Sequence, residues 1–376
     1  MRTRPFPIRP SNRKNQHGSA ILILLALIGL GAAFLLVNAL NRANSQTERD
    51  KITAAALAQA KDALIGYALR GDDALSPSRP AAFPCPDTHV PSDPANPVND
   101  PLYGTSVSPC NDGAIGRFPW RTLKTAELLD DSGTPIWYAL SGNFRGTVNI
   151  INSDSKGTLQ VRAADGAALV TPQGSEAAAI LFAPGAALAG QARGSAAEKT
   201  AAANYLEAVG AISNATGAAI AGNCNILNQG AAAQANCPTF IAGDRSATFN
   251  DRLLLVTPKD FMPIVERRVA KIAEAQLTGY YATCGYYPRP ALFSNTACLP
   301  GGSTTGCVPD ASATQGRFPY YAKTDFANAT MTDWVGLPNW FLVNRWDRVI
   351  YYAVAPGYVL NAASQACPGN CLTVDA

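Results

Sequence analysis

The sequence predicts an α+β protein in which a long N-terminal helix runs into a disulfide-bonded head. Three observations support this fold class: an uncharged apolar segment followed by a helical pattern, short strand-like segments separated by turns, and nine cysteines that all follow the apolar segment. The chain has 376 residues, of which 47% are hydrophobic and 15% charged. This composition excludes a disordered chain and allows one large or two ordinary domains.

Residues 19–41 are the most distinctive segment, because these 23 residues carry no charge. A helix of roughly 20 apolar residues crosses a hydrocarbon core about 30 Å thick. Residues 1–18 contain five basic residues and no acidic one, which predicts a cytoplasmic N terminus and an exported C-terminal part. The segment therefore predicts a single-pass transmembrane helix. A cleaved secretory signal with a site at Val37-Asn38-Ala39 and a plain one-pass anchor are the alternatives.

The junction before this segment resembles the type IV prepilin and pseudopilin family. A basic leader ends in Gln16-His17-Gly18, and the apolar segment begins at Ser19. The resemblance implies cleavage by a prepilin peptidase between Gly18 and Ser19, a mature N terminus that can be methylated, and packing against other pilin or pseudopilin subunits. Ser19 replaces the usual Phe or Met, and Ile23 replaces the usual Glu. The missing Glu argues against a major subunit and in favour of a minor one.

The helical pattern continues through residues 42–70 and returns near residue 258. Leu57, Ala60, Leu64 and Tyr67 lie on one helical face. A helix over residues 19–70 would be about 78 Å long. The second helix has a cap-then-proline start at Thr257-Pro258. Its apolar stripe is Val265, Val269, Ile272, Leu277 and Tyr280.

Residues 71–115 are predicted to be loop, because nine prolines lie between positions 77 and 109. Strands are predicted at 135–140, 147–152, 158–162, 178–183, 252–257 and 349–354. Residues 186–238 are rich in Ala, Gly, Asn and Gln, and we expect short helices and loops there.

The cysteines indicate an exported, oxidised domain. Zinc is the alternative, but the sequence has no Cys-x-x-Cys and only two histidines. Spacing and the repeat described next favour these pairs: Cys85 with Cys110, Cys224 with Cys237, Cys284 with Cys307, and Cys367 with Cys371. Cys298 would then be the odd cysteine.

Three short sequence motifs recur in the same order in the two halves of the chain. Residues 63–68 parallel 276–281, residues 116–120 parallel 316–320, and residues 136–140 parallel 350–354. We therefore predict two divergent helix-plus-sheet repeats, in which an Arg-Phe-Pro-aromatic corner packs under each helix. The alternative is that the corners are binding motifs. Their residues are Arg117, Phe118, Pro119 and Trp120, and Arg317, Phe318, Pro319 and Tyr320.

The predicted organisation has four parts. Residues 1–18 form the leader, 19–70 the transmembrane and juxtamembrane helix, 71–257 a first head lobe, and 258–376 a second, repeat-related lobe. By the resemblance, the fold is a long transmembrane helix running into a pilin-like head.

No pattern typical of an enzyme is present. There is no Gly-x-Ser-x-Gly, no Walker A motif and no dinucleotide fingerprint, and a catalytic His would have to be His89 in the proline-rich loop. After the leader the chain has 25 basic and 27 acidic residues without a basic cluster, so nucleic acid is not an expected partner. We expect no metal, cofactor or small-molecule substrate.

The expected function is that of a minor pilin-like or pseudopilin-like structural component of a type IV pilus or type II secretion system. It would be anchored in the inner membrane, with a periplasmic or extracellular head used for assembly, tip capping, adhesion or cargo contact. Its partners would be the membrane, other such subunits and prepilin peptidase. The alternative is a one-pass anchored periplasmic binding or sensory module unrelated to pili.

Overall fold

The α+β class is confirmed, but the predicted transmembrane helix is not part of the fold that the structure describes. The computed structural model describes residues 45–70, 79–93, 96–145, 150–169, 176–224, 234–299, 307–319 and 337–359. Within these ranges no helix is both long and apolar enough to cross a membrane. The two long helices there are amphipathic and carry exposed charges such as Asp62 in the first and Arg267 in the second. Residues 19–41 lie outside the described ranges.

A four-stranded antiparallel sheet forms the centre of residues 53–376, which make up one compact unit. Its strands follow the order β1-β2-β4-β9. Alternate residues of one strand face opposite layers, so Tyr138 and Leu140 join one buried cluster while Trp137 and Ala139 join another. The strands are β1 (Ala114–Arg117), β2 (Trp137–Leu140), β4 (Ala179–Ala183) and β9 (Arg252–Val256).

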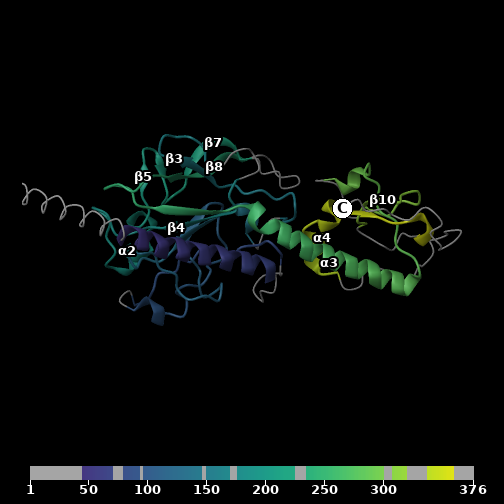
Figure 1. The fold of residues 1–376 in the computed structure, drawn as a ribbon, viewed down its shortest axis with the longest axis horizontal. Coiled ribbons are helices and arrows are strands. Elements are labelled where there is room, and N and C mark those ends of the chain that lie inside the picture. The colour runs from purple at the N-terminus through teal and green to yellow at the C-terminus, as the bar shows by residue number, and fades with distance from the viewer. Residues whose placement is uncertain are drawn as a thin grey trace, which may run out of the picture. The chain divides into compact units, whose positions relative to one another are not determined.

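Helices cover one face of this sheet. Leu57, Ala60 and Leu64 of the helix over residues 45–70 are buried, as the apolar stripe predicted. The second helix is α3 (Pro258–Cys284), and its capping box joins Thr257 and Asp260 as the cap-then-proline signal suggested. Figure 1 shows residues 53–70 (purple) along the sheet and α3 (green) continuing directly from β9.

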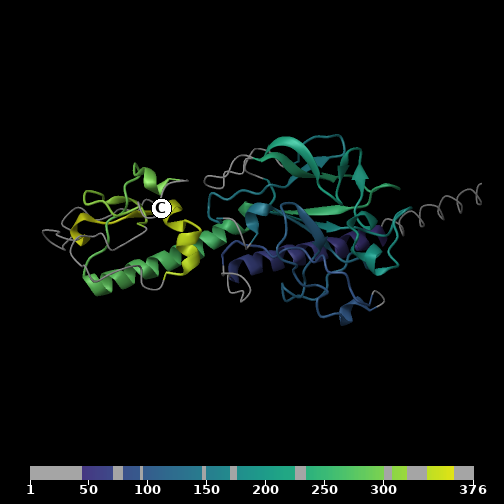
Figure 2. The same cartoon turned by 180° about the vertical axis from the view of Figure 1, so that it is seen from behind.

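A second, three-stranded sheet covers the opposite face, and the sequence predicted only one of its strands, at 158–162. Its order is β3-β8-β7, with β3 (Gln160–Ala163) parallel to β8 (Gln234–Ala242) and β7 (Ala218–Cys224) antiparallel to β8. The expectation of short helices and loops over residues 186–238 is therefore wrong for residues 218–224 and 234–238, which form strands, whereas residues 196–200 and 202–204 do form short helices. Side chains such as Phe240 and Phe182 join the two sheets, with ring centroids 5.4 Å apart. Figure 2 shows this layer in teal above the central sheet.

Small elements complete this half of the chain. A hairpin forms from β5 (Ala208–Val209) and β6 (Ile212–Ser213), and α2 (Ala196–Thr200) starts with a capping box at Ser195. Residues 79–93 and 96–113 are loop, as predicted, with one turn of 3-10 helix at Pro97–Asn99. The strand predicted at 147–152 is not formed by its described residues, 150–152.

The second half contains a two-stranded sheet of β10 (Gln315–Arg317) and β11 (Tyr351–Ala353). Two short helices, α4 (Asn339–Val343) and α5 (Trp346–Val349), come before β11. The last predicted strand therefore begins later than expected, because Val349 still belongs to α5. Asn344 follows α4 and ties this half to the first: its side chain accepts a hydrogen bond from the Ile151 amide at 3.0 Å.

The two halves repeat the same backbone pairings. Arg117 pairs with Trp137 as Arg317 pairs with Tyr351, and the next residue donates its amide proton to an isoleucine carbonyl in both copies. An isolated bridge joins Asp87 to Arg117, and an equivalent bridge joins Ala291 to Arg317. Further matched hydrogen bonds run from Tyr138 Oη to the Pro84 carbonyl and from Tyr352 Oη to the Pro288 carbonyl, at 3.1 and 2.8 Å.

The matched bridges explain why a glycine precedes the Arg-Phe-Pro sequence in both copies. A Cβ atom on Gly116 would lie 2.6 Å from the Asp87 carbonyl oxygen, and one on Gly316 would lie 2.0 Å from the Ala291 carbonyl oxygen. Neither backbone could approach its neighbour this closely with a side chain in place. Glycine is therefore required in both copies for the same steric reason.

Candidate functional site

The first Arg-Phe-Pro corner contains a buried polar cluster around Arg117 and Asp87. Arg117 ends β1 and is 4% exposed, so its guanidinium is removed from water. Asp87 lies on the neighbouring loop segment, and its carboxylate is 3.0 Å from Arg117 Nη2 and 3.1 Å from Arg117 Nε. The hydrogen bond from Nε and the ion-pair contact from Nη2 both reach Asp87 Oδ2, and together they form a buried, charge-assisted pair.

Other backbone groups complete the coordination of this pair. Asp87 accepts hydrogen bonds from the amides of Gly104 and His89 at 2.9 and 2.8 Å. Arg117 donates to the carbonyl oxygens of His89 and Lys199 and lies 4.9 Å from the ring centroid of Tyr103. The cluster thus fastens the proline-rich loop to the central sheet, which is a structural role.

The second corner keeps the arginine but not the acid. Ala291 stands where the first copy has Asp87. Arg317 donates to the Arg348 carbonyl oxygen at 2.5 Å and lies 5.8 Å from the ring centroid of Tyr351. Both arginines therefore contact an aromatic ring, while only the first forms a buried ion pair at this position.

Both corners pack into the apolar core, as predicted. Phe118 is 3% exposed and Phe318 is fully buried, and both belong to the cluster that includes Leu64 and Phe261. The space between Arg117, Tyr103 and their neighbours is filled by their own side chains and leaves no room for a water molecule. This packing favours the structural interpretation of the first corner over the binding interpretation. Tyr320 lies outside the described residues.

His89 does not form a Ser-His-Asp arrangement. Its Nε2 atom lies 3.1 Å from Asp100 Oδ2, and the same oxygen accepts from the Ser92 hydroxyl at 3.0 Å. The carboxylate therefore lies between the two other groups, whereas a nucleophilic triad needs the imidazole in that place. The hydrogen bonds from Ser92 and Leu102 amides hold the pKa of Asp100 below its ordinary range.

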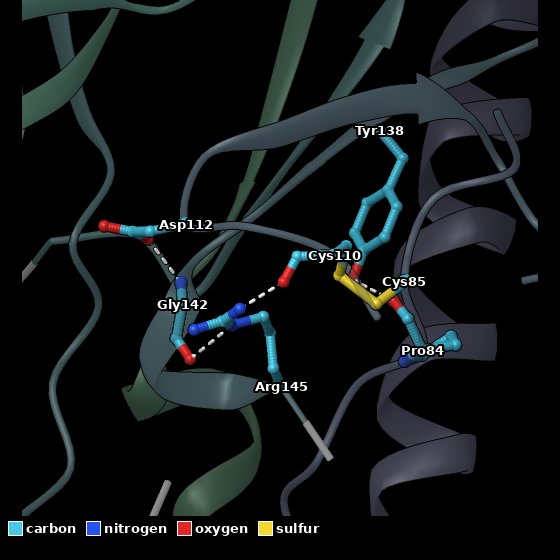
Figure 3. The surroundings of a disulfide bond; sticks show 7 residues. All are labelled: Pro84, Cys85, Cys110, Asp112, Tyr138, Gly142 and Arg145. Atoms are coloured by element: carbon cyan, nitrogen blue, oxygen red, sulfur yellow. Dashed lines mark hydrogen bonds between the residues drawn. A yellow bond between two sulfur atoms is a disulfide. The ribbon is translucent and has the colours of Figure 1, made fainter. Parts of the chain in front are cut away.

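The Cys85–Cys110 disulfide forms as predicted and closes the loop that carries Asp87. Arg145 donates to the carbonyl oxygens of Cys110 and Gly142, and the Gly142 amide donates to Asp112 (Figure 3). Tyr138 anchors the other side through its bond to Pro84 (Figure 3). The disulfide therefore lies between the helix layer and the sheet, in a network that fixes both ends of the loop.

The other disulfide predictions have different outcomes. Cys307 pairs with Cys298, so the expected bond between Cys307 and Cys284 is wrong, and so is the expectation that Cys298 is the odd cysteine. The two partners are only nine positions apart, and the 3-10 turn at Thr296–Cys298 brings Cys298 inward. Cys237 is disulfide-bonded, and its predicted partner Cys224 stays a prediction.

The remaining sequence candidates lie outside the described residues. They are Gly18 and Ser19 at the predicted cleavage junction, and Cys367 and Cys371 near the C-terminal end. The structure describes Pro119 and Trp120 of the first corner. The guanidinium carbon of Arg121 lies 4.8 Å from the centroid of the Trp120 ring.

Sequence reasoning also missed a second buried acidic group, at Asp251. Asp251 is 3% exposed and precedes β9, and the amide of Glu207 donates to its Oδ2 atom at 2.9 Å. The Asp251 amide donates in return to Glu207 Oε2 at 3.0 Å. Burial and the nearby Glu207 carboxylate raise the pKa of Asp251 well above its ordinary value. No spacing in the sequence brings residues 207 and 251 together, so this pair had no local signal.

A third buried acid, Asp347 in α5, makes stability depend on pH. Asp347 is 1% exposed, and burial raises its pKa to about 7 although Arg348 and Arg345 partly oppose this. Its pKa in the unfolded chain is about 4. Between these values the folded state binds the extra proton, so the free energy of unfolding should fall as pH rises from about 4 to about 7.

Replacing Asp347 with Asn should remove this pH dependence. Since one pKa unit corresponds to about 1.4 kcal/mol, Asp347→Asn should raise the free energy of unfolding at pH 8 by up to about 4 kcal/mol. At pH 4 the variant should match the parent. Urea unfolding at several pH values measures both effects, with Asp62→Asn on an exposed helix position as the control. An unchanged pH slope in Asp347→Asn would contradict the assignment.

Comparisons with known proteins do not assign a family or a function to the chain. No family model, curated protein or solved structure matches the chain. The geometry of the described residues is therefore the basis for any functional inference, together with the pattern of the leader.

Proposed function

We propose that the chain is a minor pilin-like or pseudopilin-like structural component of a type IV pilus or type II secretion system. One observation carries the proposal: a basic leader ends at Gly18, and 23 uncharged residues begin at Ser19. By resemblance, prepilin peptidase and other pilin or pseudopilin subunits would be its partners. Its location would be the inner membrane, with residues 53–376 in the periplasm or outside the cell.

Two features of the described residues support this proposal. Two disulfide bonds, Cys85–Cys110 and Cys298–Cys307, suit an oxidising compartment outside the cytoplasm. The polar cluster around Arg117 and Asp87 uses its groups to fix a loop to a sheet. A rigid head of this kind suits assembly, tip capping or contact with a surface or cargo.

A substitution at the leader junction tests the proposal. In cells that contain a prepilin peptidase, the parent chain should lose residues 1–18, whereas Gly18→Val should keep them, because the peptidase family cuts after this glycine. The mass of the purified chain reports the difference, and His17→Ala should be cut like the parent. Equal processing of the parent and Gly18→Val would argue against the proposal.

A periplasmic binding or sensory module is the second candidate. The observation in its favour is an open groove beside β9 with Asp251 in its lining, next to a second hollow that Asp165 and Asp244 line. This module would need neither a filament nor prepilin peptidase.

A further inference from the structure

A groove lies along the free edge of the central sheet. Its floor is formed by residues 251–254, one wall by helix residues that include Ala54 and Ala58, and the other wall by Ala242 and Gly243 at the end of β8. The groove encloses about 460 Å³, and a second hollow of about 400 Å³ shares Ala242 and Gly243 with it. The two hollows therefore form one continuous depression.

The floor of the groove offers backbone hydrogen-bonding groups. Within the described residues β9 has a partner strand, β4, on one side only. Lys61 Nζ donates to the Leu255 carbonyl oxygen at 3.2 Å, so this carbonyl faces away from β4. Alternate residues of a strand direct their backbone groups to the same side, so the N–H and C=O of Leu253 also face away from β4. They face the groove, where an added strand could pair with them.

The walls leave room for an additional strand. Ala54 and Ala58 are exposed, and Ala242 and Gly243 have at most a methyl side chain. A paired strand lies about 4.8 Å from its neighbour. Because the edge of β9 lies between the helix wall and the β8 wall, an added strand fits there only if both walls carry small side chains. Beyond this open part, the ion pair between Lys61 and Asp260, at 2.8 Å, covers the edge.

The charge of the depression favours a basic occupant. Asp251, Asp165 and Asp244 line it, and Arg252 is the one basic residue in its lining. Asp251 Oδ1 accepts no hydrogen bond within the described part of the chain, although the atom is buried. Asp251 Oδ2 is already bonded to the Asn214 amide at 2.9 Å and to the Glu207 amide. The raised pKa leaves a proton on Asp251 at neutral pH, and a Lys or Arg side chain placed beside this unused atom would favour the carboxylate and pair with it.

We propose that this groove binds an extended, basic segment of a partner polypeptide as a fifth strand on β9, with a Lys or Arg side chain at Asp251. Main-chain bonds to Leu253 supply affinity, and the carboxyl groups select the charge. The inference goes beyond the proposed function, because it stands on the groove and does not require a filament.

The test uses the full chain and labelled eight-residue peptides in a fluorescence anisotropy titration. The probe alternates Lys and Val, and its controls alternate Glu and Val or carry a central Pro, which cannot donate to a strand. Ala58→Trp fills the groove from an exposed helix position, and Asp251→Asn removes the carboxyl group that would ionise opposite a Lys side chain. Ala55→Trp places the same bulk on an exposed position outside the groove lining. Thermal unfolding of each variant checks its fold.

The Lys-Val peptide should bind the parent and Ala55→Trp equally and bind Ala58→Trp and Asp251→Asn at least tenfold more weakly. The Glu-Val and Pro peptides should bind at least tenfold more weakly to the parent. The proposal is overturned if no peptide binds, or if Ala58→Trp binds like the parent. It is also overturned if n-butylamine displaces the peptide at equal concentration, which would indicate a small-amine site. Self-association of the parent that Ala58→Trp abolishes would identify a second copy as the occupant instead.

Discussion

Replacing Asp87 with alanine should lower the free energy of unfolding by about 3–5 kcal/mol, because it leaves the Arg117 guanidinium buried without a counter-charge. Arg117 is 4% exposed, and its remaining partners are carbonyl oxygens, which offset only part of its charge. The Gly104 amide also loses its acceptor. Urea unfolding of the oxidised protein near neutral pH measures the loss.

The second copy of the unit provides a matched control. Arg317 occupies the equivalent place opposite Ala291, where no carboxylate is available to lose. Arg317→Met should therefore cost less than Arg117→Met, by about 2 kcal/mol or more. The double variant Asp87→Ala with Arg117→Met should be more stable than Asp87→Ala alone, because it removes the unpaired charge. Equal losses at the two arginines would contradict the difference that the structure shows.

Removing the Cys85–Cys110 disulfide should be the second large effect. Its partners are 25 positions apart, and closing a loop of this length stabilises the folded state by about 3–4 kcal/mol in the chain-entropy model. The loop also carries Asp87, so opening it loosens the polar cluster around Arg117. Cys85→Ala with Cys110→Ala should therefore lower the unfolding midpoint in urea.

The Cys298–Cys307 disulfide provides a comparison for this prediction. Cys298 and Cys307 are nine positions apart, so the same model gives about 2.5 kcal/mol for their loop. The pair variant Cys298→Ala with Cys307→Ala should therefore be less damaging than the first pair variant. A larger loss of unfolding free energy in the Cys298/Cys307 variant than in the Cys85/Cys110 variant would contradict this prediction.

The elements that could be predicted from the sequence were those with a strong local pattern. The helix over residues 45–70 and α3 have regular apolar stripes, and β2, β4 and β9 contain bulky apolar residues beside turns. In contrast, β7 and β8 contain mostly small and polar residues. These two strands exist because they pair with each other and because β8 also pairs with β3, and no local sequence pattern reveals such pairing.

The site was predicted only in part, for a similar reason. The repeated words located Arg117 and Arg317, but Asp87 lies 30 positions before its partner in a proline-rich loop. A fourth matched word would have pointed to it: Pro84 and Pro86 precede Asp87 as Pro288 and Pro290 precede Ala291. The predicted bond between Cys284 and Cys307 was wrong because the repeat suggested equivalent bonds in both copies, whereas the two loops are closed differently.

The most direct test of the proposed function is the N-terminal sequence and intact mass of the chain from membranes of cells with and without prepilin peptidase. The proposal predicts a chain that starts at Ser19 only when the peptidase is present. A chain that keeps Met1 in both strains, or one that starts near Leu40 in both, would contradict it.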